Sequence, residues 1–307
     1  MSTTDSLPPG ADSTLLDALI ERVRVGTTGP TAENATASVA FRTEQSARHA
    51  GRSTGYVNSV LSIRVDDAIG SCATEPGELD ASLLPEIAGS SVAELLAHPE
   101  KPVRVAALDA YLTRNRPHET HPSVRTARIP AGSSLRKSTE RARVVVELLP
   151  RGTSGPVAVI GVVNSLLAAL HRRGLDYVAC DLKGGRTEWD EPVLSDHTRA
   201  LDGAGAVLAS GMVLGNGTFD EIAAHCRAKD IPLVVFAQTG GAVFRELLGT
   251  EVTALSAEPY PFFWLTGETS DIHTYPAEKP ARDDRSPVED GPNRHRRTTN
   301  PTDGGVT

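Results

Sequence analysis

The feature that most constrains this chain is an almost uninterrupted run of apolar residues at 157–163, directly after Pro156. A strand in this run is apolar on both faces, which is typical of strands that helices cover on two sides. A helix is predicted at 166–171, ends before Gly174, and is followed by a second apolar strand at 177–180. This order is a βαβ unit, and it predicts a parallel sheet.

The alternation of strands and helices continues toward the carboxyl terminus. Further apolar strands are predicted at 206–209, 233–236 and 252–255, with helices after Thr218 and after Gly241. Parallel strands joined by helices take right-handed crossovers, which leaves few arrangements open. We therefore predict a Rossmann-like α/β domain.

The amino-terminal half has a different pattern, in which helix and strand signals lie in separate blocks. Apolar residues at helical spacing follow Ser13 and Thr14, either of which can cap that helix. Residues 37–72 carry strand signals separated by glycines and predict an antiparallel hairpin or meander. Ser91 and Glu94 form a capping box for a short helix, and a longer helix follows. Separate blocks of this kind favour an α+β domain.

These patterns divide the chain into segments. The connecting stretch has weak periodicity except at 143–149, which could be a strand or a short helix. From about residue 274 the chain is charged, rich in Pro and Gly, and almost free of large apolar residues, so it cannot order itself by burial. The predicted segments are a disordered amino terminus (1–12), a smaller α+β domain (13–116), an interdomain connection (117–154), the Rossmann-like domain (155–265) and a disordered tail (266–307).

Charge and cysteine content restrict the partners and the compartment. The formal net charge is -8, which argues against nucleic acid and anionic membranes, because both are bound mainly through Lys and Arg. Three cysteines without a CxxC spacing indicate a reduced, cytoplasmic protein. The first twelve residues do not resemble a signal peptide, and no run reaches the roughly 18 apolar residues that a membrane span needs. We expect a small-molecule ligand and no membrane partner.

Candidate binding residues follow the predicted strands. Ligands of open α/β sheets bind at the carboxyl ends of the strands, where loop amides and helix amino termini point. The first loop offers Asn164 and Ser165 as helix caps, and the second offers Asp181. Two later loops complete the predicted site with Gly215, Asn216, Gly217 and Thr218, and with Gln238, Thr239 and Gly240.

Asp181 is the candidate for contact with a nucleoside. It lies 20 residues beyond Gly161, the spacing at which dinucleotide folds place a carboxylate on a ribose hydroxyl. The first loop, however, has one glycine where the dinucleotide fingerprint needs three, and Asn164 stands where the backbone should approach a pyrophosphate. A nucleoside-type ligand is therefore favoured over a dinucleotide. The alternative is that Asp181 only caps the end of its strand.

The loop at 215–218 has two interpretations. Gly215 and Gly217 flank Asn216, so the backbone can take a positive φ and present its amides, and Thr218 is a suitable N-cap. The segment could be a polar cradle for an anionic or amide-bearing ligand, or a tight turn with an ordinary cap. Gln238 begins a similar loop after the next strand, and two such loops side by side favour a site.

A tight metal site is not predicted. His225 and Cys226 are adjacent on a helix and point about 100° apart, and Cys226 shares the apolar face of that helix. His118 and His121, with Glu119 between them, could chelate a metal if helical, but flanking prolines favour a loop. The aromatic segment 258–264 could line the pocket or seal an edge of the sheet. Catalytic residues cannot be assigned.

Several stretches resemble the family named for heavy-metal chelation. In the carboxyl-terminal half they are 157–161, 211–220 (GMVLGNGTFD, similar to the family's glycine followed by Val-Asn-Gly-Thr-Leu-Asp) and 233–241; in the amino-terminal half they are 70–73, 91–96 and 106–110. The resemblance implies a Rossmann-like carboxyl-terminal domain, an amino-terminal domain similar to that of enolase, and a ligand site between the two.

The chain also departs from the family's pattern. Its second strand ends in Asp181 where the family commonly has Glu, and residues 237–241 replace a Gly-Pro-Ser loop. The first loop carries Asn164 and Ser165. These changes in the pocket put a shared ligand in doubt.

Two functions follow. The leading hypothesis is a small-molecule-binding protein that handles a metal-chelating metabolite in a pocket between the domains, with a divalent metal as one cofactor to test. The alternative is an enzyme of specialised metabolism that uses a nucleoside-type cofactor such as S-adenosylmethionine in the same pocket. A purely structural protein would not need glycine-rich loops at its strand ends. A homodimer is compatible with the sequence, which does not set the oligomeric state.

Overall fold

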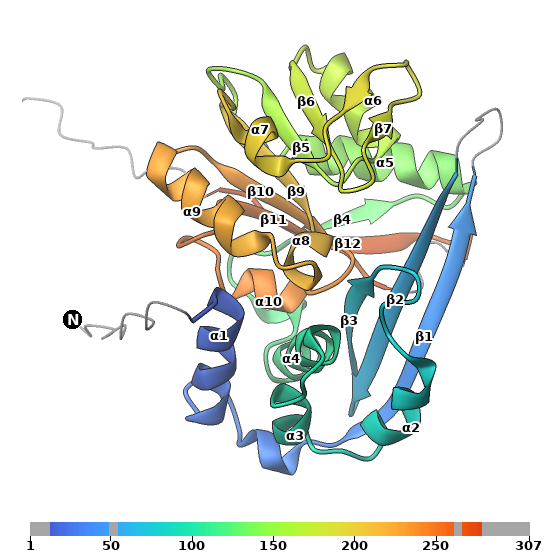
Figure 1. Cartoon of the computed structure of the whole chain (residues 1–307), viewed down its shortest axis with the longest axis vertical. Coiled ribbons are helices and arrows are strands. Elements are labelled where there is room, and N and C mark those ends of the chain that lie inside the picture. Colours follow the sequence, from blue (N-terminus) through green and yellow to red (C-terminus); the bar gives the residue numbers. More distant parts are fainter. Residues whose placement is uncertain (1–12, 49–54, 261–265, 278–307) are drawn as a thin grey trace, which may run out of the picture. The chain divides into compact units, whose positions relative to one another are not determined.

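The apolar strands of the carboxyl-terminal half form the centre of a seven-stranded sheet in this computed structural model, which describes residues 13–48, 55–260 and 266–277. The strand order is β4-β12-β11-β10-β9-β5-β6. Five strands are parallel: β5 (Val157–Ile160), β6 (Tyr177–Cys180), β9 (Ala206–Ser210), β10 (Leu233–Ala237) and β11 (Ala254–Ala257). The predicted α/β plus α+β fold class is confirmed (Figure 1).

Two antiparallel strands extend this sheet beyond the predicted range. β12 (Ser270–Tyr275) pairs with β11, and β4 (Arg125–Ile129) pairs with β12. The predicted interdomain connection at 117–154 contains β4 and α5 (Ser134–Val146), and α5 agrees with the helical alternative for the start of 143–149. The expectation of disorder from residue 266 is wrong for β12. Both strands are short and largely polar, so their sequences carry little strand signal. The predicted disordered segments 1–12 and 278–307 lie outside the described residues.

Helices cover both faces of the sheet because successive strand residues point to opposite sides. In β10, Leu233, Val235 and Ala237 pack into one core, and Val234 and Phe236 pack into the other. α5 and α6 (Asn164–Arg172) bury their apolar residues in the second core. The first core contains α4 (Lys101–Asn115), α7 (His197–Leu201), α9 (Phe219–Lys229) and α10 (Gly241–Arg245).

The predicted meander in the amino-terminal half is a three-stranded antiparallel sheet. It consists of β1 (Ala37–Ala47), β2 (Tyr56–Val65) and β3 (Ala68–Thr74), in that spatial order. The predicted capping box at Ser91 is confirmed, and the predicted cap of the first helix is Thr14, which forms a capping box with Asp17. The remaining elements are α1 (Leu15–Arg24), η1 (Ala32–Asn34), η2 (Ala81–Leu83), α2 (Leu84–Ile87), α3 (Val92–Leu96), η3 (His118–Thr120), β7 (Gly185–Arg186), β8 (Pro192–Val193) and α8 (Met212–Gly215).

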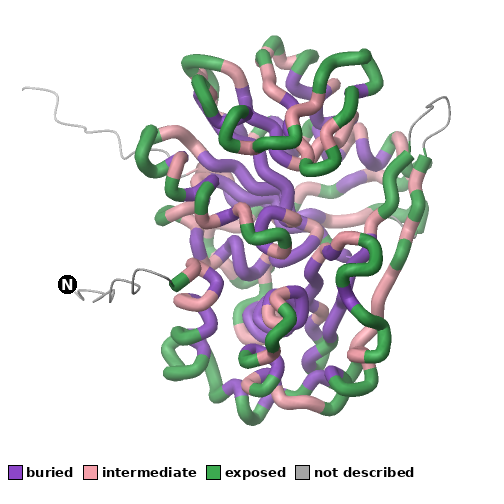
Figure 2. Tube along the Cα trace, viewed as in Figure 1, coloured by how far each residue is buried: buried purple, intermediate pink, exposed green. Residues whose placement is uncertain are grey.

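α4 joins the two sheets. A β-carbon on Gly70 of β3 would stand 2.0 Å from the backbone nitrogen of Ala110, so only glycine allows strand and helix to approach this closely. Ten of the fifteen residues of α4 are buried, as Figure 2 shows along this helix. The first core runs without a break from β2 and β3 through α4 to α10 and the large sheet. The described residues up to Ala277 therefore belong to one compact unit.

None of the helices in the described part of the chain has the length and apolar character that a bilayer span requires.

Candidate functional site

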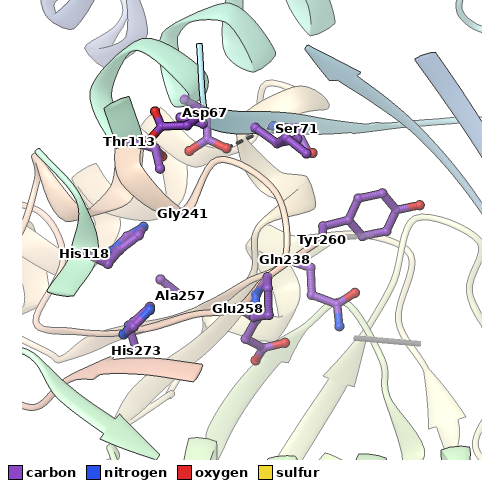
Figure 3. A pocket seen from close by; sticks show the side chains of 14 residues that line it. Asp67, Ser71, Thr113, His118, Gln238, Gly241, Ala257, Glu258, Tyr260 and His273 are labelled. Atoms are coloured by element: carbon purple, nitrogen blue, oxygen red, sulfur yellow. Dashed lines mark hydrogen bonds between the residues drawn. The ribbon is translucent and has the colours of Figure 1, made fainter. Parts of the chain in front are cut away.

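A cavity of about 290 Å³ opens at the carboxyl ends of β10 and β11, where β3 and α4 pack over the sheet (Figure 3). It is lined by Asp67, Ala68, Ile69 and Ser71 around β3, Asp109 and Thr113 on α4, His118 on η3, Gln238 and Gly241 after β10, residues 257–260 at the end of β11, and His273 on β12. Residues far apart in the sequence thus make one polar site.

Asp109 closes the cavity on the α4 side and connects α4 to both neighbouring elements. Its carboxylate accepts hydrogen bonds from the backbone N–H of Ser71 at 3.0 Å and of Ala242 at 2.8 Å. The N–H of Gly240 donates to the carbonyl oxygen of Ser71 at 2.9 Å. Burial raises the pKa of Asp109 to about 6, although these N–H groups and the positive charge of Arg245 oppose the shift. The carboxylate is thus a buried anion held at some cost in free energy.

Glu258 forms a buried ion pair behind the cavity wall. Its Oε2 accepts a hydrogen bond from Nε of Arg141 on α5 at 2.6 Å, and both side chains are at least 95% buried. Ser256 donates to the other carboxylate oxygen at 3.2 Å, and the Arg141 guanidinium lies 5.2 Å from the ring centroid of Phe236. Glu258 therefore keeps a partnered charge next to the cavity.

Two histidines lie at one end of the cavity. The imidazoles of His118 and His273 are stacked, with centroids 5.5 Å apart and planes 8° from parallel. Nδ1 of His118 lies 2.7 Å from the hydroxyl oxygen of Tyr275. Burial, with added repulsion from Arg245, His273 and His121, lowers the pKa of His118 to about 3, so this ring is neutral at physiological pH.

Tyr260 lies at the other end of the cavity, away from the histidines (Figure 3). Its hydroxyl is hydrogen-bonded to Thr43 of β1, which ties the end of β11 to the long β1–β2 hairpin. The predicted lining role of segment 258–264 therefore applies to Glu258, Pro259 and Tyr260. Residues 261–264 lie outside the described residues.

Of the ten predicted binding residues, the cavity includes Gln238. Gly240, with φ of 69°, borders it through its hydrogen bond to Ser71, and Thr239 is buried between these two. The loop after β10 is therefore the predicted loop that reaches the cavity.

The loop at 215–218 is occupied by local contacts. A β-carbon on Gly215 would stand 2.8 Å from the carbonyl oxygen of Ala73, so the glycine permits close packing on β3. The side-chain oxygen of Asn216 accepts hydrogen bonds from the N–H and the hydroxyl of Thr218. Thr218 stands at the N-cap position of α9, as predicted, but its side chain makes no capping hydrogen bond there. These contacts fit the interpretation of the loop as a tight turn. The polar cradle for an anionic or amide-bearing ligand at Gly217 stays a prediction.

The first two loops are also engaged locally. Asn164 and Ser165 do not cap α6, which begins at Asn164 after Val163 without a side-chain cap, so that prediction is wrong. Ser165 is buried and hydrogen-bonded to Ser138 of α5 at 2.6 Å. Asp181 accepts from the N–H groups of Val162 and Lys183 at 3.3 and 3.1 Å, as expected if it caps its strand end.

The strand order explains why these loops do not meet Gln238. The switch in strand order lies between β5 and β9, where Gly161 packs against the side chain of Ser210. β6 and β10 are three strand spacings apart, or about 14 Å. Asp181 and Gln238 therefore stand at separate positions along one edge of the sheet.

The residues with metal-binding potential are dispersed. His118 faces Tyr275 and His273, whereas Nδ1 of His121 accepts a hydrogen bond from the N–H of Ser123 at 3.3 Å. Within the described ranges, no three His, Cys, Asp or Glu side chains come close enough to hold a metal ion. The three cysteines are buried, and burial raises the pKa of Cys180 to about 11 and of Cys226 to about 12.

Sequence reasoning missed most of the cavity. Asp109 and Thr113 lie on a helix whose sequence indicates only packing in the core, and His273 lies in the segment predicted to be disordered. A usable signal was the cluster of polar residues between Pro117 and Pro122, which includes His118.

Two solved structures share this fold. One is a protein of unknown function from the DUF364 family of Desulfitobacterium hafniense, with a TM-score of 0.55 and 13% identity over 84% of this chain and 96% of that chain. The other is a DUF364 family protein of unknown function from Pyrococcus horikoshii, with a TM-score of 0.51 and 17% identity over 84% and 98% of the two chains. At these identities the likeness shows the fold alone. No family model and no curated protein matches the chain.

Proposed function

We propose that the protein binds a small polar metabolite in the cavity between β3, α4 and the ends of β10 and β11. The observation that carries this proposal is the convergence of Asp109, Gln238 and two imidazoles on a cavity at the carboxyl edge of the sheet, the edge where open α/β folds take their ligands. A volume of about 290 Å³ lies at the lower end of the range of roughly 300 to 1,000 Å³ for small-molecule pockets, which favours a small ligand.

The family resemblance supports the same proposal. DUF364 proteins are often described as a heavy-metal chelation domain, so the structural neighbours agree with the family that the sequence motifs resemble. Membership in that family is a proposal here, as is the finer hypothesis that the metabolite chelates a metal. The polar lining could contact a chelating ligand through its amide, imidazole and carboxylate groups.

Nothing in the described residues favours the S-adenosylmethionine enzyme. Its ribose anchor, Asp181, is turned to the N–H groups of Val162 and Lys183 and lies about three strand spacings from Gln238. The cavity-bound metabolite is the function that the geometry supports best.

A ligand panel tests the proposal. The purified chain is screened by thermal shift against amino acids, amino-acid chelators, divalent metals, nucleosides and S-adenosylmethionine. A ligand at 100 times its dissociation constant stabilises by about 2.7 kcal/mol. Thr113→Leu, which replaces a lining hydroxyl and narrows the cavity, should abolish the shift of any hit. Thr120→Leu, on an exposed side chain of η3, is the matched control. A hit that is indifferent to Thr113→Leu would place the ligand elsewhere.

A further inference from the structure

His273 has one nitrogen with a partner and one without. Its Nε2 lies 3.1 Å from Oε1 of Glu119. Its Nδ1 is buried and has no hydrogen-bond partner among the described residues. His273 is one of the residues that line the cavity, and Nδ1 is the buried polar atom of its ring that lacks a partner.

The partner of Nε2 determines what Nδ1 offers. In the neutral form of His273 the imidazole has one N–H, and because a carboxylate can only accept, this N–H lies on Nε2 and donates to Glu119. Nδ1 then carries a lone pair and acts as an acceptor. A buried acceptor without a donor costs free energy, and a ligand N–H group would relieve that cost.

The surroundings of His273 favour a positively charged donor. The neighbouring ring of His118 is neutral, because its pKa is lowered to about 3. Asp67 and Asp109 are the acidic residues whose side chains are not already held in an ion pair behind the wall, and none of the described residues that line the cavity is Lys or Arg. The positive charge of Arg141 is paired with Glu258, and the positive charge of Arg245 acts on both Asp109 and His118. The described side chains that line the cavity therefore offer carboxylate charge without a Lys or Arg cation.

We propose that the ligand carries an ammonium group, that this group donates a hydrogen bond to Nδ1 of His273, and that Glu119 positions the imidazole for it. This inference rests on the proposed function and names the class of its ligand. Glu119 is suited to a test because its side chain is 67% exposed, so its replacement should not disturb folding.

The experiment uses three probes with the same carbon skeleton on the full chain: 1,3-diaminopropane, 1,3-propanediol and malonate. Imidazole nitrogens are followed by NMR on ¹⁵N-histidine-labelled protein, assigned with His273→Gln and His118→Gln. Before any probe is added, the N–H of His273 should be on Nε2. Diaminopropane should shift the Nδ1 resonance, propanediol should bind at least tenfold more weakly, and malonate should produce no shift.

Variants of Glu119 distinguish its role in positioning the His273 imidazole from an effect of its negative charge. Glu119→Ala should weaken diaminopropane binding about tenfold, because the imidazole loses the acceptor that fixes its tautomer. Glu119→Gln keeps an acceptor oxygen and should stay within about threefold of the parent chain. Glu147→Ala removes an exposed carboxylate directly after α5 and should leave the affinity unchanged. If Glu119→Gln falls as far as Glu119→Ala, Glu119 acts by charge and the positioning role is wrong.

Two further outcomes would overturn the inference. One is an N–H found on Nδ1 in the free protein; the other is a probe that shifts the His118 resonances without moving Nδ1 of His273. In the second case the cavity binds ligands and the proposed function stands. If neither the probes nor the ligand panel perturbs any residue of the cavity, the proposed function fails as well.

Discussion

The loops after β5 and β6 and the loops after β10 and β11 lie on the same edge of one sheet, yet they differ in what surrounds them. The side chains of Asp181 and Ser165 are satisfied by neighbours in their own half of the chain. Gln238 and Gly241, after β10, line a cavity that β3 and α4 enclose. Strand ends supply the chemistry for binding, but a second layer packed over them makes the enclosed space.

The largest expected effect comes from disrupting the contact between β3 and α4, which pack over the strand ends. Gly70→Ala places a β-carbon 2.0 Å from the backbone of Ala110, and two backbones cannot separate without breaking the core. We expect a loss of more than about 4 kcal/mol in the free energy of unfolding, measured by urea denaturation. Gly267→Ala, whose β-carbon would meet its nearest neighbour at 3.4 Å, should cost less than about 1 kcal/mol. Equal losses in the two variants would mean that α4 and β3 do not approach so closely.

Breaking the ion pair at the cavity wall should be nearly as costly. Arg141→Met leaves the Glu258 carboxylate buried without its partner, and such a change typically costs about 3 to 5 kcal/mol. Arg141→Met combined with Glu258→Leu should recover most of that stability, which a thermal denaturation series can measure. Arg143→Met, on an exposed side chain of the same helix, should change stability by less than about 0.5 kcal/mol. A double variant as unstable as the single one would show that the pair is not the source of the loss.

Asp109, which closes the cavity on the α4 side, should make the free energy of unfolding depend on pH. Its pKa is raised from 3.8 to about 6 in the folded state, so the folded chain binds more protons than the unfolded chain between these values. Its contribution to stability is therefore full below about pH 4 and lost as pH rises through 6, a change of about 3 kcal/mol. Unfolding free energies of the parent chain and Asp109→Asn, measured from pH 4 to pH 7, should differ by a pH-dependent amount of that size. A constant difference would contradict the raised pKa.

The smallest effect is expected at Asp181, in the loop after β6, which does not line the cavity. Asp181→Ala removes an acceptor for two backbone N–H groups of a partly exposed turn and should cost about 1 kcal/mol. Binding of any cavity ligand should be unchanged in isothermal titration, because Asp181 stands about 14 Å along the sheet from Gln238. A loss of affinity in this variant would favour a ligand that spans both loops.

The fold could be predicted further than the site. The strands of the parallel core are continuous in apolar character, and the capping boxes at Thr14 and Ser91 follow from local residue types. β4 and β12 escaped prediction because both strands are short and largely polar, although β12 lies inside the sheet between β4 and β11. Gln238 was found from its position after a strand, whereas His118 and His273 meet only because residues 155 positions apart in the chain pack together.

By itself, the sequence determined the alternation of strands and helices, the parallel core of the large sheet and the absence of a dinucleotide fingerprint, because these depend on local composition and spacing. The tertiary structure alone decided which strand ends are enclosed. That choice depends on the contact of Gly70 with α4 and on the hydrogen bonds from Ser71 and Ala242 to Asp109. Such contacts join distant segments, and no local pattern encodes which segments will meet.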